Sequence, residues 1–188
     1  MADKIEQLQK LMESWIEHGY EFGAISGPFD IIHEGHLAYM KAAKEFRPKN
    51  YFLIAIVNSD KYLIYKHGYA ALSFDTRLSI VSSIRYVDFV IPWDEINVAG
   101  ALEILRPSYF FNSGDRKPDN QNNEERSVCI KHGIQEIFLD LPKVNSSSGI
   151  KQSIWTNQLK KLYTFSQEYH SKYDGYSYRF NDSAPYKP

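Results

Sequence analysis

The chain has 188 residues, a formal net charge of −1, and 43% apolar and 24% charged residues. These values fit one globular domain with a sizeable core, and the near-zero net charge argues against a surface that coats nucleic acid. Cys129 is the one cysteine, which excludes an internal disulfide framework and a cysteine-rich zinc site. The sequence shows no signal peptide and no apolar run near about 18 residues, so we expect a cytoplasmic protein without membrane contact.

An amphipathic helix is expected at the N-terminus. Apolar residues recur there at helical spacing between charged ones, and Gly19 ends the pattern. The apolar positions are Ile5, Leu8, Leu11, Met12, Trp15 and Ile16. We expect this helix to pack on the main domain or on a second copy of the chain.

Apolar runs and helical patterns alternate through the rest of the chain. Strands are expected at 22–26, 51–57, 87–91, 109–112 and 134–139. Helices are expected at 33–44, 75–85, 99–105, 124–132 and beyond 145, with a loop at 61–74. This alternation predicts an α/β fold with a Rossmann-like, parallel five-stranded sheet and helices on both faces. We divide the chain into an N-terminal extension (1–19), a main domain (20–164) and an aromatic tail (165–188).

Residues 22–40 read FGAISGPFDIIHEGHLAYM, which predicts a strand, a glycine turn and a helix start. His33 and His36 lie three positions apart at that start, so both imidazoles lie on one helix face. The free N–H groups and the positive end of the helix dipole suit a phosphate there. Gly35 has no side chain that would block a phosphate between the two histidines.

The pattern Gly27-x-Phe29-Asp30-x-x-His33-x-Gly35-His36 resembles the signature of the nucleotidyltransferase superfamily with the HxGH motif. That superfamily includes cytidylyltransferases, heptose-phosphate adenylyltransferases and pantetheine-phosphate adenylyltransferases. Further segments resemble heptose-phosphate adenylyltransferases and glycerol-3-phosphate cytidylyltransferases, and the likeness covers about residues 22–155. They are Val57-Asn58-Ser59-Asp60, the stretch TRLSIVSSIRYVDFVIP from Thr76, Ser113-Gly114-Asp115-Arg116, and Ser146-Ser147-Ser148-Gly149-Ile150-Lys151.

The resemblance implies transfer of NMP from a nucleoside triphosphate to a phosphorylated small molecule, with release of pyrophosphate. It assigns catalytic roles to His33, His36, Lys44, Ser147 and Lys151. It assigns nucleotide binding to Ser26, Gly27, Phe29, Asp30, Gly35, His36, Gly114, Asp115 and Ser146 to Ser148. It assigns acceptor binding to Asn58, Asp60, Lys66, Arg77 and Arg116. Mg2+ is expected to bridge the phosphates, and Asp30 either holds the turn or helps to place the metal.

The acceptor and the nucleotide stay open at this stage. The second-strand and Gly-Asp-Arg segments favour a sugar phosphate of the heptose 1-phosphate type with ATP or CTP over glycerol 3-phosphate with CTP. A different class, a non-catalytic nucleotide-binding or scaffold domain, is the alternative. We also expect a homodimer, with the tyrosine-rich tail packed on a neighbouring subunit or over the site.

Overall fold

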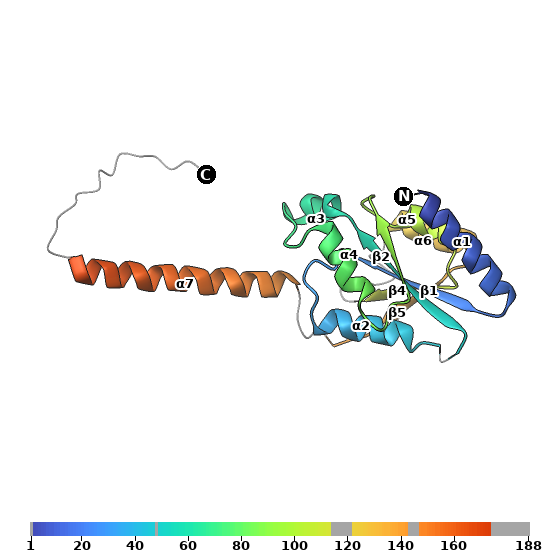
Figure 1. Ribbon diagram of the computed structural model, residues 1–188, viewed down its shortest axis with the longest axis horizontal. Helices are drawn as coiled ribbons and strands as arrows, with labels where there is room; N and C mark the ends of the chain where they lie inside the picture. Colours follow the sequence, from blue (N-terminus) through green and yellow to red (C-terminus); the bar gives the residue numbers. More distant parts are fainter. Residues whose placement is uncertain (1, 48, 114–121, 143–146, 174–188) are drawn as a thin grey trace. The chain divides into compact units, whose positions relative to one another are not determined.

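Parallel strands form the centre of the protein. The computed structural model describes residues 2–47, 49–113, 122–142 and 147–173. The strands are β1 (Glu21–Gly27), β2 (Tyr51–Asn58), β3 (Phe89–Trp93), β4 (Tyr109–Ser113) and β5 (Gln135–Leu139). They form one parallel sheet in the order β3-β2-β1-β4-β5 (Figure 1). Because the order reverses between β1 and β4, the carboxyl ends of these two strands form the switch point where such sheets bind ligands.

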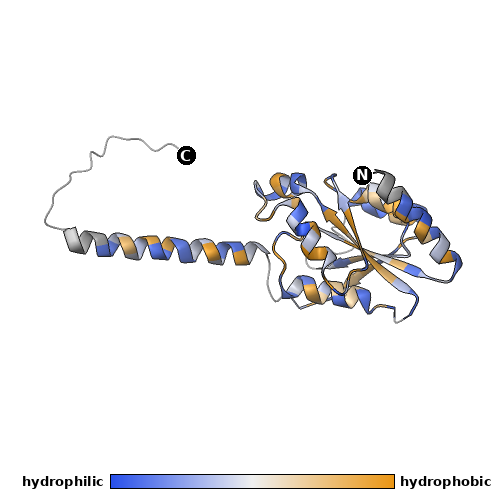
Figure 2. Cartoon of the chain, in the orientation of Figure 1, coloured by the Kyte–Doolittle hydropathy of each residue, from blue (hydrophilic) through white to orange (hydrophobic). Residues whose placement is uncertain are grey.

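Helices cover both faces of the sheet. One face carries α1 (Ala2–Glu17), α5 (Ala99–Leu105) and α6 (Asn123–His132), and the other carries α2 (Glu34–Lys44) and α4 (Phe74–Ser82) (Figure 1). Side chains of β2 alternate between the two cores, with Ile54 and Ile56 on the first face and Leu53 and Ala55 on the second. Apolar residues dominate the central strands, while the helices mix apolar and polar residues (Figure 2). The predicted fold class is confirmed.

The N-terminal helix packs on the domain. Met12 is buried, and the ring of Trp15 stacks on Phe52, with 4.6 Å between centroids, and on Phe22. Gly19 follows with a φ of 79°, a left-handed conformation that ends the helical segment. Of the two predicted arrangements, packing of this helix on the main domain is the one that the structure shows.

A long helix, α7 (Ser147–Tyr173), begins where the contacts divide the chain into residues 1–147 and 148–188. It continues past position 164, where we placed the end of the main domain, and the last 15 residues of the predicted tail lie outside the described residues. Its apolar residues Ile154, Trp155, Leu159 and Leu162 are 55% to 65% exposed. No helix in the described part of the chain is long and apolar enough to cross a membrane.

Two segments differ most from the sequence-based expectation, and the other boundaries shift by at most three residues. Residues 61–74 are not all loop, because α3 (Asp60–His67) follows β2 and ends at Gly68 with a φ of 80°. Only Leu63 of this helix is buried, so its apolar residues carry almost no helical period. The third strand continues through Pro92 to Trp93 rather than stopping before the proline. It is an edge strand, where a residue without an N–H is tolerated.

Gly23→Ala is expected to destabilise the fold. A Cβ atom at Gly23 would lie 1.8 Å from the Tyr51 hydroxyl oxygen and 2.7 Å from the Phe111 ring. Forcing atoms into a packed core costs about 1–3 kcal/mol. Tyr51→Phe removes the clashing oxygen, which is buried without a hydrogen-bond partner among the described residues. The double variant Gly23→Ala/Tyr51→Phe should therefore recover part of the lost stability. Urea unfolding of both single variants and the double variant measures this, and a Gly23→Ala protein as stable as wild type would contradict the packing.

Candidate active site

The chain makes a strained turn where β1 ends. Ser26 and Gly27 close the strand, and Phe29 adopts a left-handed conformation with a φ of 47° although it is a buried aromatic residue. Its ring lies over Gly27, where an added Cβ would sit 3.1 Å from the ring. Left-handed backbone is costly for bulky residues and persists where the surrounding structure enforces it, often at functional sites. This turn leads directly into His33, the N-cap residue of α2.

His33 caps the N-terminus of α2 with its side chain. Its backbone is extended, and its Nδ1 atom accepts a hydrogen bond from the backbone N–H of Gly35 at 3.1 Å. In the neutral ring one nitrogen is a donor and the other an acceptor, so this cap places the proton on Nε2. Burial lowers the pKa of His33, which favours this neutral form.

His36 lies directly against His33. Their ring centroids are 4.0 Å apart, and the Phe29 ring meets His36 edge-on at 5.5 Å. Burial first, and then the charge of His33, lower the pKa of His36 to about 4, while the backbone carbonyl of Ile31 opposes this shift. His36 is therefore neutral at pH 7 in the free protein, and the predicted histidine pair is brought together at the switch point.

Ser147 joins this site from a distant part of the chain. Its hydroxyl donates to the carbonyl of Ile31 at 3.0 Å, between the turn and the first residue of α7. Ser148 is exposed and Lys151 is half-buried, and both belong to the second unit. Four other predicted residues lie outside the described residues and keep their roles as predictions. They are Gly114, Asp115, Arg116 and Ser146.

Asp30 holds the turn. Its carboxylate is buried and accepts hydrogen bonds from the backbone N–H groups of Ala71, at 2.9 Å, and Leu72, at 3.0 Å. These contacts tie the segment between α3 and α4 to the histidine turn. They favour the first of the two roles that we considered for this residue, and a part in placing a metal stays a prediction.

Arg77 is a correction. We expected its guanidinium to meet a phosphate of the acceptor, but its side chain is completely buried. It donates to the carbonyls of Pro28 and Asn58, the latter at 2.7 Å, and to the carboxylate of Asp60 at 2.8 Å. The guanidinium thus joins the ends of β1 and β2 to the start of α3. Arg77 therefore holds together the backbone around the site, and a substrate cannot contact its buried side chain without rearrangement.

The predicted acceptor residues lie at the end of β2, where Asn58 is the last residue, and on α3, which carries Asp60 and Lys66. Asn58 is buried, Asp60 is partly engaged by Arg77 with its side chain 42% exposed, and Lys66 is exposed on α3. Asp60 and Lys66 are accessible to a ligand at this edge, whereas the Asn58 side chain is buried. Acceptor binding by these residues stays a prediction.

Lys44 is the second correction. Its ammonium donates to the carbonyl of Tyr51 at 3.0 Å and to Asp88 at 2.5 Å. Tyr51 begins β2 and pairs with Glu21, which begins β1, so Lys44 lies at the amino edge of the sheet. Eight helical residues, or about 12 Å, separate it from His36. The end of α2 is the wrong end for a triphosphate held at its N-terminus.

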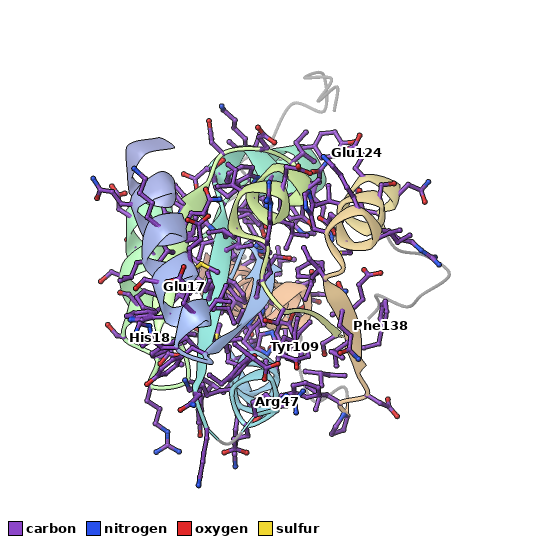
Figure 3. The ribbon with its side chains drawn as sticks, turned by 90° about the vertical axis from the view of Figure 1, so that its right-hand side faces the viewer. Glu17, His18, Arg47, Tyr109, Glu124 and Phe138 are labelled. Atoms are coloured by element: carbon purple, nitrogen blue, oxygen red, sulfur yellow. The ribbon has the colours of Figure 1, made fainter. Side chains whose placement is uncertain are left out.

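The opposite ends of the domain are visible in Figure 3. Arg47, just beyond α2, lies beside Tyr109 at the start of β4, and its Nε donates to the Tyr109 hydroxyl at 3.1 Å. Glu124, in the first turn of α6 beyond the carboxyl ends of the strands, lies at the other end of the domain. Residues near the end of α2 therefore support the fold rather than the candidate site.

Lys44→Met is expected to leave catalysis intact. Because the ammonium contacts only the amino edge of the sheet, kcat/KM should stay within about twofold of wild type. Stability should fall by about 1 kcal/mol, the usual net value of a hydrogen bond, since Asp88 keeps the N–H of Leu53 at 2.7 Å. Steady-state kinetics and urea unfolding test this together. A fall in kcat of tenfold or more would return Lys44 to the site.

Sequence reasoning missed the backbone partners of the site and one buried acid. The Ile31 carbonyl and the amides of Ala71 and Leu72 have no sequence signal, because every residue type carries them. Glu125, almost fully buried, accepts from the N–H of Val98 at 3.1 Å and so holds the start of α5. Its place three residues after the cap Asn122 was a readable signal of a helix start.

A histidine pair at a helix N-terminus, at the switch point of a parallel sheet, is a candidate phosphate site on a Rossmann-like fold. The cytidylyltransferase-like family model matches residues 24–165, more than half of the sequence. The chain therefore belongs to the cytidylyltransferase-like family of nucleotidyltransferases.

The chain is also similar to part of several curated proteins. It is 26% identical over 161 residues to the bifunctional protein HldE of Hahella chejuensis and 30% identical over 139 residues to that of Coxiella burnetii (strain RSA 493 / Nine Mile phase I). These matches cover 85% and 73% of this chain, but 33% and 28% of the relatives. The chain thus spans about a third of the length of the curated relatives that it matches.

Two solved structures share the fold. The lipopolysaccharide core biosynthesis protein of Thermoplasma volcanium GSS1 matches with a TM-score of 0.55 at 23% identity, over 66% of this chain and 98% of that one. Pantoate-beta-alanine ligase of Francisella tularensis matches with a TM-score of 0.51 at 15% identity, over 77% and 67% of the two chains. At these identities the likeness supports the fold alone.

Proposed function

We propose that this nucleotidyltransferase moves NMP from ATP or CTP to a phosphorylated small molecule, most simply a sugar 1-phosphate of the heptose type. The observation that carries the proposal is the pair of His33 and His36 at the first turn of α2, with ring centroids 4.0 Å apart, next to the carboxyl end of β1. Imidazole and backbone N–H donors in one place match the acceptor-only oxygens of a triphosphate.

In the proposed reaction, a phosphate oxygen of the acceptor attacks the α-phosphorus in line, and pyrophosphate leaves with the electrons of the broken bond. His33 and His36 donate to the phosphate oxygens on which charge grows. Ser147 and Lys151 are proposed to hold the β- and γ-phosphates. No side-chain nucleophile is required, so catalysis consists of positioning and charge stabilisation.

The nucleotide is expected to enter as its Mg2+ complex. The described residues contain no group of three or more His, Cys, Asp or Glu side chains that could hold a metal ion. Asp30 already accepts two backbone N–H groups. These residues fit a phosphate better than a protein-held cation. Bound to the nucleotide, Mg2+ would supply charge neutralisation along the phosphates.

We propose that the acceptor binds at the edge of the sheet beyond β2. Lys66 and the partly exposed Asp60 lie there, which suits a ligand with both a phosphate and hydroxyl groups. Similarity to HldE proteins supports the sugar-phosphate reading over glycerol 3-phosphate.

Pyrophosphate release tests the proposal. ATP and CTP are offered separately, with Mg2+, against a panel of sugar 1-phosphates and glycerol 3-phosphate. We expect release that requires one nucleotide and one sugar phosphate. Release with glycerol 3-phosphate and CTP alone would favour the alternative acceptor. Nucleotide binding by thermal shift with no release across the panel would support the non-catalytic alternative.

A further inference from the structure

The turn between β1 and α2 is anchored on both sides of Phe29. The anchors are hydrogen bonds from Arg77 to the Pro28 carbonyl, from Ala71 and Leu72 to the Asp30 carboxylate, and from Ser147 to the Ile31 carbonyl. Phe29 lies between them with a φ of 47°. Left-handed backbone is costly for a bulky residue and persists where the surroundings over-determine it, as these anchors do here.

The ring of Phe29 lies in the protein interior. Phe29 is 1% exposed and belongs to the apolar core that includes Met40 of α2 and Val81 of α4. A Cβ atom added at Gly27 would lie 3.1 Å from the ring, so the ring also packs under the end of β1. A residue buried to this extent cannot contact a nucleotide, and the nucleotide-binding role that the resemblance assigns to Phe29 can only be indirect.

The same ring packs against His36. The two centroids are 5.5 Å apart and the ring planes meet at 70°, while the centroid of His33 lies 4.0 Å from that of His36. The buried Nδ1 of His36 has no hydrogen-bond partner among the described residues. The orientation of this imidazole therefore depends on its two ring neighbours. His33 is fixed by its bond from the Gly35 N–H, and Phe29 is fixed by the anchored turn.

Resting on the proposed function, we infer that Phe29 is a positioning residue for His36. The strained turn directs the aromatic ring against the imidazole, and the ring holds the imidazole in the orientation that meets the phosphates. A group misplaced by about 1 Å can lose about 10²-fold in rate, so this contact matters although Phe29 touches no substrate. Leucine at position 29 would keep the Cβ atom and the left-handed backbone but lose the aromatic ring, which leaves His36 free to tilt.

Phe29→Leu is expected to lower kcat for pyrophosphate release by about 10–100-fold, with the KM of the nucleotide within about threefold of wild type. Phe22→Leu is the matched control, because Phe22 is 0% exposed and lies in the core on the opposite face of the sheet. Both variants should lower the urea midpoint of unfolding, but Phe22→Leu should keep kcat within about twofold of wild type. Equal losses of kcat in the two variants would reduce Phe29 to a packing residue and overturn the inference.

A double variant shows whether Phe29 acts through His36. In a His36→Ala background, Phe29→Leu should lower kcat by less than about twofold, because the imidazole that it positions is gone. A further fall as large as that in wild type would overturn the inference and leave the proposed function standing. No pyrophosphate release by wild type across the whole panel would overturn the proposed function, and the inference with it.

Proton–carbon NMR of the histidine rings adds a test without nucleotide. The signals of His36 are assigned by their loss in His36→Ala. We expect Phe29→Leu to shift them, because they lose the ring current of Phe29, while the signals of the exposed His18 stay unchanged. His36 signals that do not move would contradict the ring contact and overturn the inference.

Discussion

His36→Ala is expected to lower kcat by about 10²–10³-fold, equivalent to ~3–4 kcal/mol of transition-state stabilisation. The ring lies at the first turn of α2 against His33. In the proposed reaction it donates there to the charge that develops on the α- and β-phosphates. The loss should fall mainly on kcat, because the interaction strengthens as the charge develops.

The fold should survive this change. The cap of α2 belongs to His33, and Met40 and Ala43 of the same helix remain buried. Steady-state pyrophosphate release gives kcat, and circular dichroism confirms folding. His18→Ala, at an exposed position far from the switch point, controls for histidine loss as such. Ordinary turnover in a folded His36→Ala protein would sink the mechanism.

Arg77→Met is expected to lower the free energy of unfolding by about 2–4 kcal/mol, because two carbonyl oxygens lose a charged donor at about 1–3 kcal/mol each, while Asp60, with its side chain 42% exposed, can turn to solvent. The substitution leaves the carbonyls of Pro28 and Asn58 and the carboxylate of Asp60 without their shared donor. It also removes the guanidinium that packs over the Phe74 ring, 5.2 Å from its centroid. Such a loss is a large share of the stability of a typical domain.

Arg77→Lys should recover little, because one ammonium cannot reproduce the planar fork that reaches three acceptors. Arg85→Met is the matched control, since Arg85 is exposed and donates to the hydroxyl of the adjacent Tyr86, and its stability should stay within about 0.5 kcal/mol of wild type. Urea unfolding measures all three proteins. Full stability in Arg77→Lys, with a raised KM for the acceptor alone, would restore the phosphate-binding role that we first predicted.

Most of the fold could be predicted from the sequence because its strands are nearly unbroken apolar runs with clear stops. Tyr51 to Val57 is an example, buried on both sides as parallel strands are. The helix α3 could not be predicted in the same way, since Ile64 and Tyr65 are exposed and only Leu63 is buried. A hydrophobic pattern in the sequence predicts a helix only where one face of that helix is buried against the rest of the protein.

The histidine pair could be predicted because motif and helix start coincide. Lys44 and Arg77 show where such reasoning fails. A sequence position does not say at which edge of the sheet a side chain ends, and Lys44 is three turns from the phosphate end of its helix. Nor does it say whether an arginine faces a ligand or three backbone and carboxylate oxygens, as Arg77 does. Both answers depend on contacts between distant segments.

Label transfer tests the central claim most directly. The nucleotide that supports pyrophosphate release is supplied with radioactive phosphorus at either the α- or the γ-position, together with its acceptor and Mg2+. Attack at the α-phosphorus predicts that the α-label appears in the acceptor product and the γ-label in pyrophosphate. Label from the γ-position in the acceptor would mean phosphoryl transfer, as in a kinase, and would contradict nucleotidyl transfer at His33 and His36.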